Sequence, residues 1–298
     1  MASNIHRRLW IHIVLFVVTL VTTTFAGARI VENFDQNRPC FSIEEDLDAY
    51  TEMLQSPARL TKGLLFSVPL LVILLAHEFG HYLACVYYGL DASLPYFLPA
   101  PTFIGTLGAF IRIRSPIYSR RELFDVGIAG PLAGVVFLLP ALGVGMAFSK
   151  VIPGINDQGD LVFGTPLFIR FLEQIIFPGV PVSDVYLHPV ARAAWVGLFA
   201  TALNLLPFGQ LDGGHILYAV ASQRFRLLAR IFWVCLIPMG FLYWPWWAWA
   251  AVVFFTGLKH PPIYDPYPLG AGRLQLALLS VIIFVLCFMP APIATSGV

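Results

Sequence analysis

Long apolar segments alternate with short polar ones along most of the chain. The segments predicted to span a membrane are residues 9–28, 61–87, 124–149, 190–221, 272–292 and the long block 228–258. Each is about as long as the ~20 residues that a helix needs to cross the hydrocarbon core, or longer. Pro238, Gly240 and Pro245 interrupt the long block, which favours two short helices turning near residues 243–245 over one kinked span. The pattern therefore predicts an all-α polytopic membrane protein with six or seven transmembrane helices.

Two stretches between these segments have a period of their own. Residues 104–114 alternate apolar and polar residues after two glycines, which predicts a short strand or hairpin. Residues 166–177 place Arg170, Glu173 and Gln174 opposite an apolar face, which predicts a helix lying in the membrane interface. The tryptophans at 244, 246, 247 and 249 are expected to form an interfacial belt.

Composition supports the membrane class and narrows the partners. The chain is 58% hydrophobic and only 12% charged, whereas a soluble domain carries about 25% charged residues. A net charge of +1 argues against a nucleic acid partner and leaves the lipid bilayer as the expected surroundings. The four cysteines are scattered and form no CxxC pair, so neither a disulfide framework nor a thiolate metal site is indicated.

The charged loops predict the orientation. More loop Lys and Arg residues fall on the side of the N-terminus, which places that end in the cytoplasm. Arg112, Arg114, Arg120 and Arg121 are expected to set this topology rather than to bind substrate. Residues 1–28 read as a retained anchor, because their apolar run exceeds the 7–15 residues of a signal peptide, the alternative reading. The lack of a Ser/Arg-rich leader favours a bacterial inner membrane, with a plastid or other organelle left open.

The sequence HEFGH at residues 77–81 carries the most specific chemistry. On a helix, His77 and His81 are four residues apart and project from one face, a spacing at which two imidazoles bind one zinc ion. Glu78 lies beside them and is a candidate base for a water molecule. Ionisable side chains at membrane depth cost several kcal/mol each, so three of them on adjoining turns predict a metal partner, zinc or another divalent ion.

Asp212 is the candidate third ligand. It is the only acid in the apolar stretch 200–219, and catalytic zinc usually takes three protein ligands. At ~1.5 Å per residue, His77 and Asp212 lie about 22 and 30 Å from the outer ends of their spans, and a break at Pro207 and Gly209 shortens the second distance. Both sites then fall in the cytoplasmic half. The alternative for Asp212 is a helix cap.

Together these motifs resemble the site-2 protease family of intramembrane zinc metalloproteases. The resemblance rests on HEFGH at 77–81 and NLLPFGQLDGGH at 204–215, with GTLGAFI at 105–111 similar to the family's re-entrant strand region and AGPLAG at 129–134 to its following small-residue span. HPPIYDPYPLG at 260–270 is a weaker similarity, to a C-terminal extension of some members. Gly209 replaces a proline of some members, and Gly134 replaces an asparagine of many.

The resemblance implies a function and a role for each matching residue. His77, His81 and Asp212 would bind Zn²⁺, Glu78 would be the general base, and Asn204 would contact the substrate backbone or the transition state. The expected activity is hydrolysis of peptide bonds in single-span transmembrane proteins, within the membrane. His215 is then expected to support the site rather than bind the metal. In this reading 1–60 is an anchor span with an acidic outer loop, 61–221 the catalytic core with a re-entrant hairpin, and 222–298 a membrane hairpin with the last span.

Rival readings make different use of the same residues. A membrane transporter also carries ionisable residues in broken helices, but it does not require Glu78 beside a histidine pair. A catalytically inactive membrane scaffold is disfavoured by the complete ligand set. A prenyl-protein protease would take its third ligand from a glutamate-containing motif, which the LDGG context does not supply. The sequence does not specify the substrate or the oligomeric state.

Overall fold

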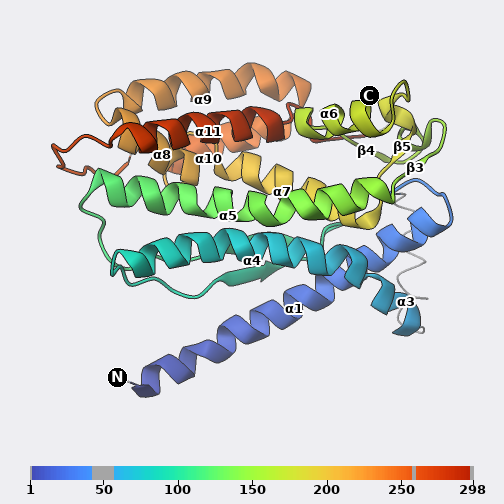
Figure 1. The fold of residues 1–298 in the computed structure, drawn as a ribbon, viewed down its shortest axis with the longest axis horizontal. Coiled ribbons are helices and arrows are strands. Elements are labelled where there is room, and N and C mark those ends of the chain that lie inside the picture. Colours follow the sequence, from blue (N-terminus) through green and yellow to red (C-terminus); the bar gives the residue numbers. More distant parts are fainter. Residues whose placement is uncertain (1, 42–56, 257–259, 296–298) are drawn as a thin grey trace.

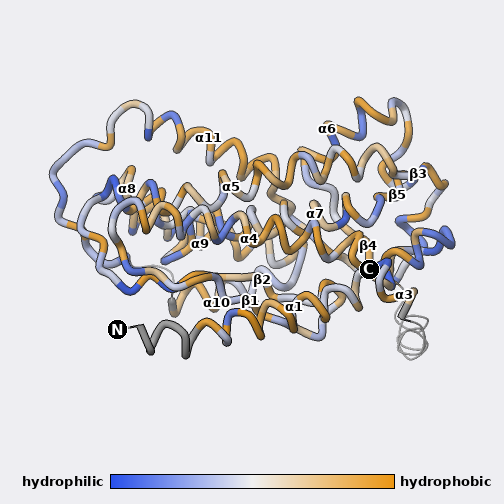
Figure 2. The backbone as a smooth tube through the Cα atoms, turned by 60° about the horizontal axis from the view of Figure 1, so that its bottom comes forward, coloured by the Kyte–Doolittle hydropathy of each residue, from blue (hydrophilic) through white to orange (hydrophobic). Residues whose placement is uncertain are grey.

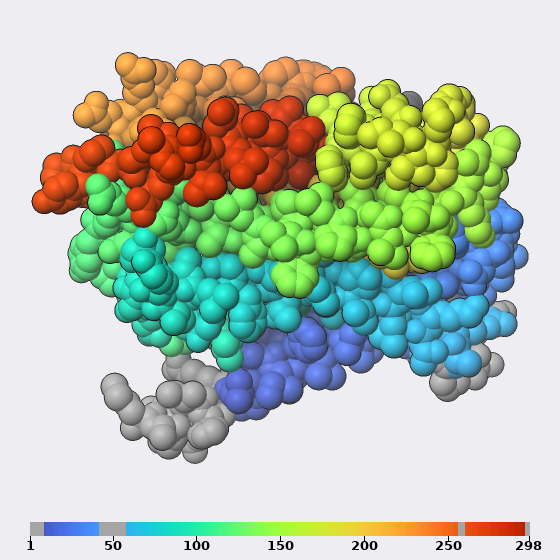
Figure 3. All heavy atoms as spheres, in the orientation of Figure 1, coloured from blue at the N-terminus to red at the C-terminus, as the bar shows by residue number. Residues whose placement is uncertain are grey.

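Helices stacked in layers make up most of the molecule (Figure 1). The structure is a computed structural model that describes residues 2–41, 57–256 and 260–295. α4 packs between α1 and α5, and α7, α8 and α11 pack on α5. The space-filling view shows α4 and α5 in contact along their lengths (Figure 3). The helices are α1 Ala2–Asp35, α3 Pro57–Lys62, α4 Leu64–Tyr87, α5 Arg120–Ala147, α6 Leu167–Ile176, α7 Pro189–Asn204, α8 Asp212–Ala221, α9 Phe225–Leu242, α10 Pro245–Thr256 and α11 Ala271–Cys287.

The outer faces of these helices are apolar, which identifies a membrane protein. Within the described residues, four helices are long and apolar enough to cross a membrane: Leu9–Asp35 of α1, α4, α5 and α9. Large apolar side chains such as Leu65, Val136 and Val234 are exposed on them, and apolar residues run along the length of the helices (Figure 2). A soluble protein rarely exposes so large an apolar surface, whereas a bilayer covers it.

The segment predicted as one span over 190–221 is two helices. α7 ends at Asn204 and α8 begins at Asp212. Pro207 has no backbone N–H to continue the helix, and Gly209 adopts a left-handed φ of 51°. The turn is closed by hydrogen bonds from Leu205 N to Thr201 O and from Leu211 N to Phe208 O, both 3.0 Å. The break moves Asp212 from mid-helix to the first residue of a new helix.

The block 228–258 is the predicted hairpin of two helices, α9 and α10, turning at residues 243–244. Trp233 Nε1 donates a hydrogen bond to Ala250 O at 2.8 Å, which ties the two helices together. The expected tryptophan belt is wrong for Trp246, which is only 2% exposed and donates to Pro290 O. Its neighbours Trp244 and Trp247 are exposed.

Within the part of the chain that the structure describes, three small antiparallel sheets supplement the helices, so only the long elements are all helical. The predicted strand within 104–114 is β2, Thr106–Phe110, paired with β1, Tyr96–Pro99, which the sequence did not predict. The other pairs are β3 Lys150–Val151 with β5 Val185–Tyr186, and β4 Leu161–Phe163 with β6 Ile293–Thr295. Two short 3₁₀ turns, Ile155–Asp157 and Val182–Asp184, lie among them.

The predicted helix over 166–177 is α6, and of its three polar residues only Glu173 faces inward, because Arg170 and Gln174 are exposed. Glu173 is only 5% exposed, whereas Phe171 and Ile175 are 58% and 60% exposed. Arg192 of α7 is also buried, with its guanidinium 4.7 Å from the centroid of the Phe163 ring. α6 therefore presents its apolar face outward. The acidic outer segment is described only in part, because residues 42–56 lie outside the described residues.

Candidate metal centre

The three polar residues of HEFGH lie in the second half of α4 and point into the protein. His77, Glu78 and His81 are 6%, 5% and 7% exposed. The apolar run around them makes α4 helical, and the i, i+4 spacing places both imidazoles on the side that packs on α5 and α8. The polar groups that would be costly in lipid are thus withdrawn from it.

Asp212 meets both histidines. Its Oδ2 lies 3.1 Å from His77 Nε2, and its Oδ1 lies 3.2 Å from His81 Nε2. The two Nε2 atoms are 3.2 Å apart. Among the described residues, this is the one cluster of three His, Cys, Asp or Glu side chains with ligand spacing. The structure therefore brings together the three residues that the sequence proposed as ligands.

The geometry of the three side chains fits a small tetrahedral cation. Ligand atoms that each lie 2.0–2.1 Å from zinc at tetrahedral angles are about 3.3 Å apart, close to the separations seen here. His81 Nδ1 lies 2.7 Å from the carbonyl of Val126, which can only accept a hydrogen bond, so Nδ1 carries the proton and the Nε2 lone pair points to the cluster. Asp212 Oδ2 is buried and makes no hydrogen bond within the described residues. Such an atom fits a metal ligand.

Asp212 does not cap a helix. It is the first residue of α8, the preceding Leu211 occupies the cap position, and no side chain there makes a capping hydrogen bond. The carboxylate instead turns toward the histidines of α4. Its position in the first turn of a helix is favourable for a negative charge.

Small residues of α5, within the AGPLAG sequence at 129–134, allow α4 to come close at the site. A Cβ added at Gly130 would lie 2.1 Å from His81 Nε2. At Gly134, where many members of the resembled family carry asparagine, a Cβ would lie 3.3 Å from the Cβ and 3.4 Å from the Nδ1 of His77. Both glycines therefore face the histidines directly.

Asn204 and Glu78 complete the immediate surroundings. Asn204, the last residue of α7, has its Nδ2 3.2 Å from His77 Nε2. Glu78, Asn204 and the three clustered residues line a cavity of about 200 Å³ together with Ile111, which follows β2. Residues from four segments thus enclose one small, largely buried space.

The sequence did not predict that His260 would lie beside the site, in contact with His215. His215 Nδ1 lies 3.0 Å from His260 Nε2, and His260 stacks on Tyr218 of α8 with ring centroids 4.1 Å apart. His215 itself is outside the cluster, as expected. The proline-rich run HPPIYDPYPLG between two apolar segments was the signal that something other than a plain loop follows α10.

The fold and this site define a class: a helical membrane protein whose buried His-His-Asp cluster, with an adjacent glutamate, is built from two separate helices. Comparison with known protein families makes the assignment specific. Residues 65–241 match Peptidase family M50, the site-2 protease family, and because this match spans more than half of the chain, the chain belongs to that family.

Curated relatives agree with this assignment. The chain is 31% identical over 233 residues to "Probable zinc metalloprotease EGY1, chloroplastic" of Oryza sativa subsp. japonica, which covers 74% of this chain and 39% of the relative. The Arabidopsis thaliana protein of the same name is 31% identical over 231 residues, covering 73% and 41%. "Probable zinc metalloprotease EGY2, chloroplastic" of Oryza sativa subsp. indica is 34% identical over 158 residues, covering 50% and 27%. The chain thus spans about two-fifths of the length of the first two relatives.

The comparisons do not support the predicted bacterial inner membrane. The relatives are named as chloroplast proteins. The prediction rested on the composition of the N-terminal segment, which does not report the compartment.

Proposed function

We propose that this protein is a zinc-dependent peptidase that hydrolyses peptide bonds of transmembrane proteins within the membrane. The convergence of His77, His81 and Asp212 carries the proposal, because their ligand atoms face one another at 3.1–3.2 Å in a buried position. Membership of Peptidase family M50 and the zinc metalloprotease names of the relatives support both the activity and the metal.

Three side chains would hold the zinc ion and two would handle the reaction. Zinc in such a site supplies Lewis-acid chemistry, since it lowers the pKa of water and polarises the scissile carbonyl. Glu78, in the same cavity, would take the proton of the attacking water and deliver it to the leaving amine. The amide of Asn204, beside His77, would donate a hydrogen bond to the oxygen that gains charge.

The extended residues 111–114, which directly follow β2, would hold the unwound substrate. A helical substrate must open before attack, and its backbone groups then need partners that lipid does not supply. Ser93 N donates to Arg112 O, and Arg114 N donates to Asp91 O, so alternate residues of this strand pair with the β1 side. The backbone groups of Ile111 and Ile113 therefore face the other way, toward the metal centre, where both residues line the cavity. Strand addition at this edge is the arrangement we propose.

Seven crossings with a cytoplasmic N-terminus account best for the placement of the loops. The segments 88–119 and 260–270 meet at the start of α5, while β6 after α11 pairs with β4, between α5 and α7. These pairings require α10 to return the chain to the side of the α5 start before α11 crosses again. We propose residues 61–221 as the catalytic core, between an N-terminal anchor and a C-terminal membrane hairpin with the last span, and single-span transmembrane proteins as substrates.

The test compares the parent protein with Glu78→Gln. Both are purified as full chains, assayed for bound zinc, and incubated in lipid with a panel of single-span membrane proteins. The proposal expects equal zinc content, cleavage by the parent and at least a thousandfold slower cleavage by the variant, roughly the scale of a lost catalytic acid–base group. Equal cleavage by both proteins would remove Glu78 as the base. Ion or solute flux without cleavage by the parent would instead indicate a transporter.

A further inference from the structure

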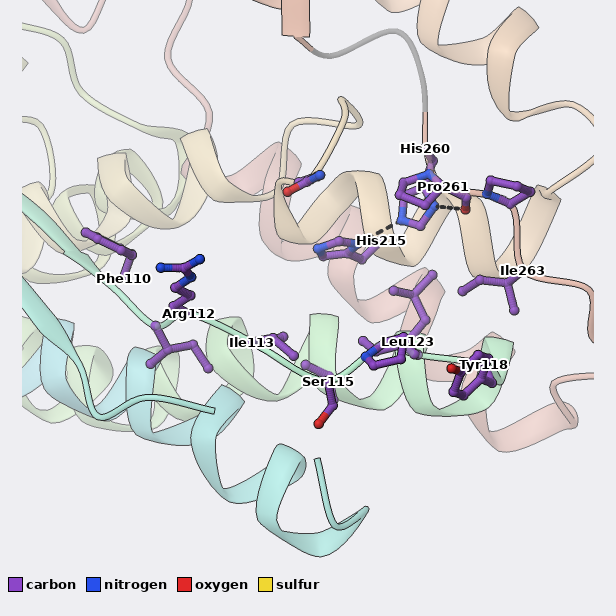
Figure 4. Close-up of a pocket in the computed structure, with 16 residues that line it drawn as sticks. Phe110, Arg112, Ile113, Ser115, Tyr118, Leu123, His215, His260, Pro261 and Ile263 are labelled. Carbon is purple, nitrogen blue, oxygen red and sulfur yellow. Dashed lines mark hydrogen bonds between the residues drawn. The ribbon is translucent and has the colours of Figure 1, made fainter. Parts of the chain in front are cut away.

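A larger cavity adjoins the metal centre on the side where α5 begins. Its volume is about 700 Å³, within the range of about 300–1,000 Å³ of ligand-binding cavities. It shares Ile111, Ile113, Gln210 and His215 with the small cavity that holds Glu78, so the two spaces are continuous along the strand. Figure 4 shows its two sides: the chain from Phe110 to Tyr118 on one, and His215, His260 and Ile263 on the other.

The second side includes His260–Ile263, the first part of the segment His260–Leu269, here called the strap, which is held in place at several points. Asp265 Oδ2 accepts hydrogen bonds from Arg120 N at 2.9 Å and Ser119 Oγ at 3.1 Å, at the start of α5. Arg121 donates to Pro268 O. Ile263 N donates to the hydroxyl of Tyr218 at 2.9 Å. The cavity therefore has two fixed walls, which favours binding of an extended segment with little ordering cost.

Within the described part of the chain, the lining carries one positively charged side chain and no negatively charged one. Arg112 is the one Arg or Lys on it, and no Asp or Glu lines the cavity among the described residues. The remaining polar lining residues are uncharged or histidine, and the rest of the lining is apolar. A cavity of this kind complements an apolar segment that carries an acidic side chain.

Arg112 differs from the other three arginines near the start of α5. Arg114 lies 3.5 Å from Asp91. Arg120 and Arg121 donate to the backbone of the strap. For the guanidinium of Arg112, the described residues show no hydrogen bond or ion pair, and Figure 4 shows it on the same side of the strand as His215. Three arginines thus contact other segments, whereas the side chain of Arg112 is exposed and makes no such contact with the residues that the structure describes.

We propose that this cavity binds an extended segment of the polypeptide substrate next to the cleaved bond, and that Arg112 selects a carboxylate side chain in it. The inference rests on the proposed peptidase function of the adjoining centre. Arg112 directly follows Ile111, which lines the same small cavity as Glu78, so the selected side chain lies within a few residues of the bond. Arginine suits this role because its planar fork binds a carboxylate through two hydrogen bonds.

The experiment measures peptide binding separately from cleavage. The full chain carrying Glu78→Gln is placed in zwitterionic lipid nanodiscs, so that anionic headgroups do not compete for Arg112. Its ligands are labelled ten-residue peptides of alternating valine and glycine, with one central residue set to Asp, Asn or Lys. Binding is followed by fluorescence anisotropy. The Asp peptide is expected to bind about fivefold more tightly than the Lys peptide, the upper range for a solvent-accessible ion pair.

Arg112 and Arg114 variants, each made in the Glu78→Gln protein, test whether Arg112 selects the carboxylate. Arg112→Gln should remove the preference for Asp and Arg112→Glu should reverse it, whereas the matched control Arg114→Gln should retain it. A preference that survives Arg112→Glu, or a parent that binds none of the peptides or all three equally, would overturn the inference. Because these measurements use a protein without Glu78, they are independent of cleavage. Failure of the peptidase proposal would appear instead as a wild-type chain that cleaves no substrate.

Discussion

Gly130 of α5 lies against the imidazole of His81 so closely that any side chain at that position would overlap it. The added Cβ would lie 2.1 Å from Nε2 and 2.4 Å from Cε1 of a ring whose Nδ1 is hydrogen-bonded to Val126 O, one turn earlier on the same helix. The ring cannot move aside without losing that hydrogen bond. The spacing of two helices thus controls the position of one proposed ligand.

Gly130→Ala should therefore weaken metal binding. We expect at least about tenfold lower zinc affinity, by analogy with loss of the groups that orient metal-binding histidines, and a parallel loss of cleavage. Zinc titration of the purified protein measures the first effect. Gly143→Ala, on the same helix, is the matched control, because a Cβ added at Gly143 would meet nothing within 4 Å. Equal zinc affinity in both variants would contradict the proposed constraint.

Asn204→Ala should slow cleavage while leaving the metal in place. The lost hydrogen bond to the transition state is expected to lower kcat by about 10²–10³. Metal analysis and kinetics on the same sample separate this effect from loss of the site. Thr201→Ala, one turn earlier on α7 and bonded only within its helix to Gly197 O, controls for helix packing. If both variants lose stability alike and keep kcat, Asn204 joins helices and takes no part in the reaction.

Glu173→Gln should change how stability depends on pH. Burial raises the pKa of Glu173 to about 7, against the opposing effects of Arg170 and Arg192. The folded state then holds a proton that the unfolded chain releases at its ordinary pKa of 4.5. Stability therefore falls as pH rises from about 4.5 to about 7, by up to about 1 kcal/mol per pH unit. Thermal unfolding at pH 5, 6 and 7 should show a flatter slope for the variant, and an unchanged slope would count against a buried, protonated Glu173.

Asp265→Ala should loosen the strap. The variant removes the acceptor for Arg120 N and Ser119 Oγ, and loss of such a helix-capping contact costs about 1 kcal/mol. Hydrogen exchange of the strap amides and of the first turn of α5 should quicken about fivefold, the same energy expressed as an equilibrium constant. Asp157→Ala, in a 3₁₀ turn among the small sheets near β4, should leave these amides unchanged. Unaltered exchange in Asp265→Ala would show that the other strap contacts suffice.

The convergence of His77, His81 and Asp212 could be predicted from the sequence because its determinants are local or additive. The four-residue spacing of His77 and His81 determines their common face, and a constant rise per residue gives the depth of Asp212. Pro207 and Gly209 indicated where the single span expected over 190–221 could break. The hairpin of α9 and α10 was likewise predicted from Pro238, Gly240 and Pro245.

The remaining features depend on contacts between distant segments. Nothing in the period of residues 96–99 marks them as the partner of β2, and nothing in 161–163 indicates a pair at 293–295. Trp246 shares its residue type with Trp244 but is covered by the segment after α11. For α6 the helix was predicted correctly, but its period did not separate Glu173, which is buried against the protein, from Arg170 and Gln174, which are exposed.

The attachment of the strap has a consequence for biosynthesis. The two histidines proposed as ligands are made early, whereas one wall of the neighbouring cavity includes His260–Ile263 of the strap, which is attached to the start of α5 at residues 119–121. A nascent chain that already contains the His-His-Asp cluster would therefore still lack that wall of the proposed peptide cavity. The proposed binding of substrate would become possible only after the strap has been synthesised, so shorter nascent chains would not hold a neighbouring protein.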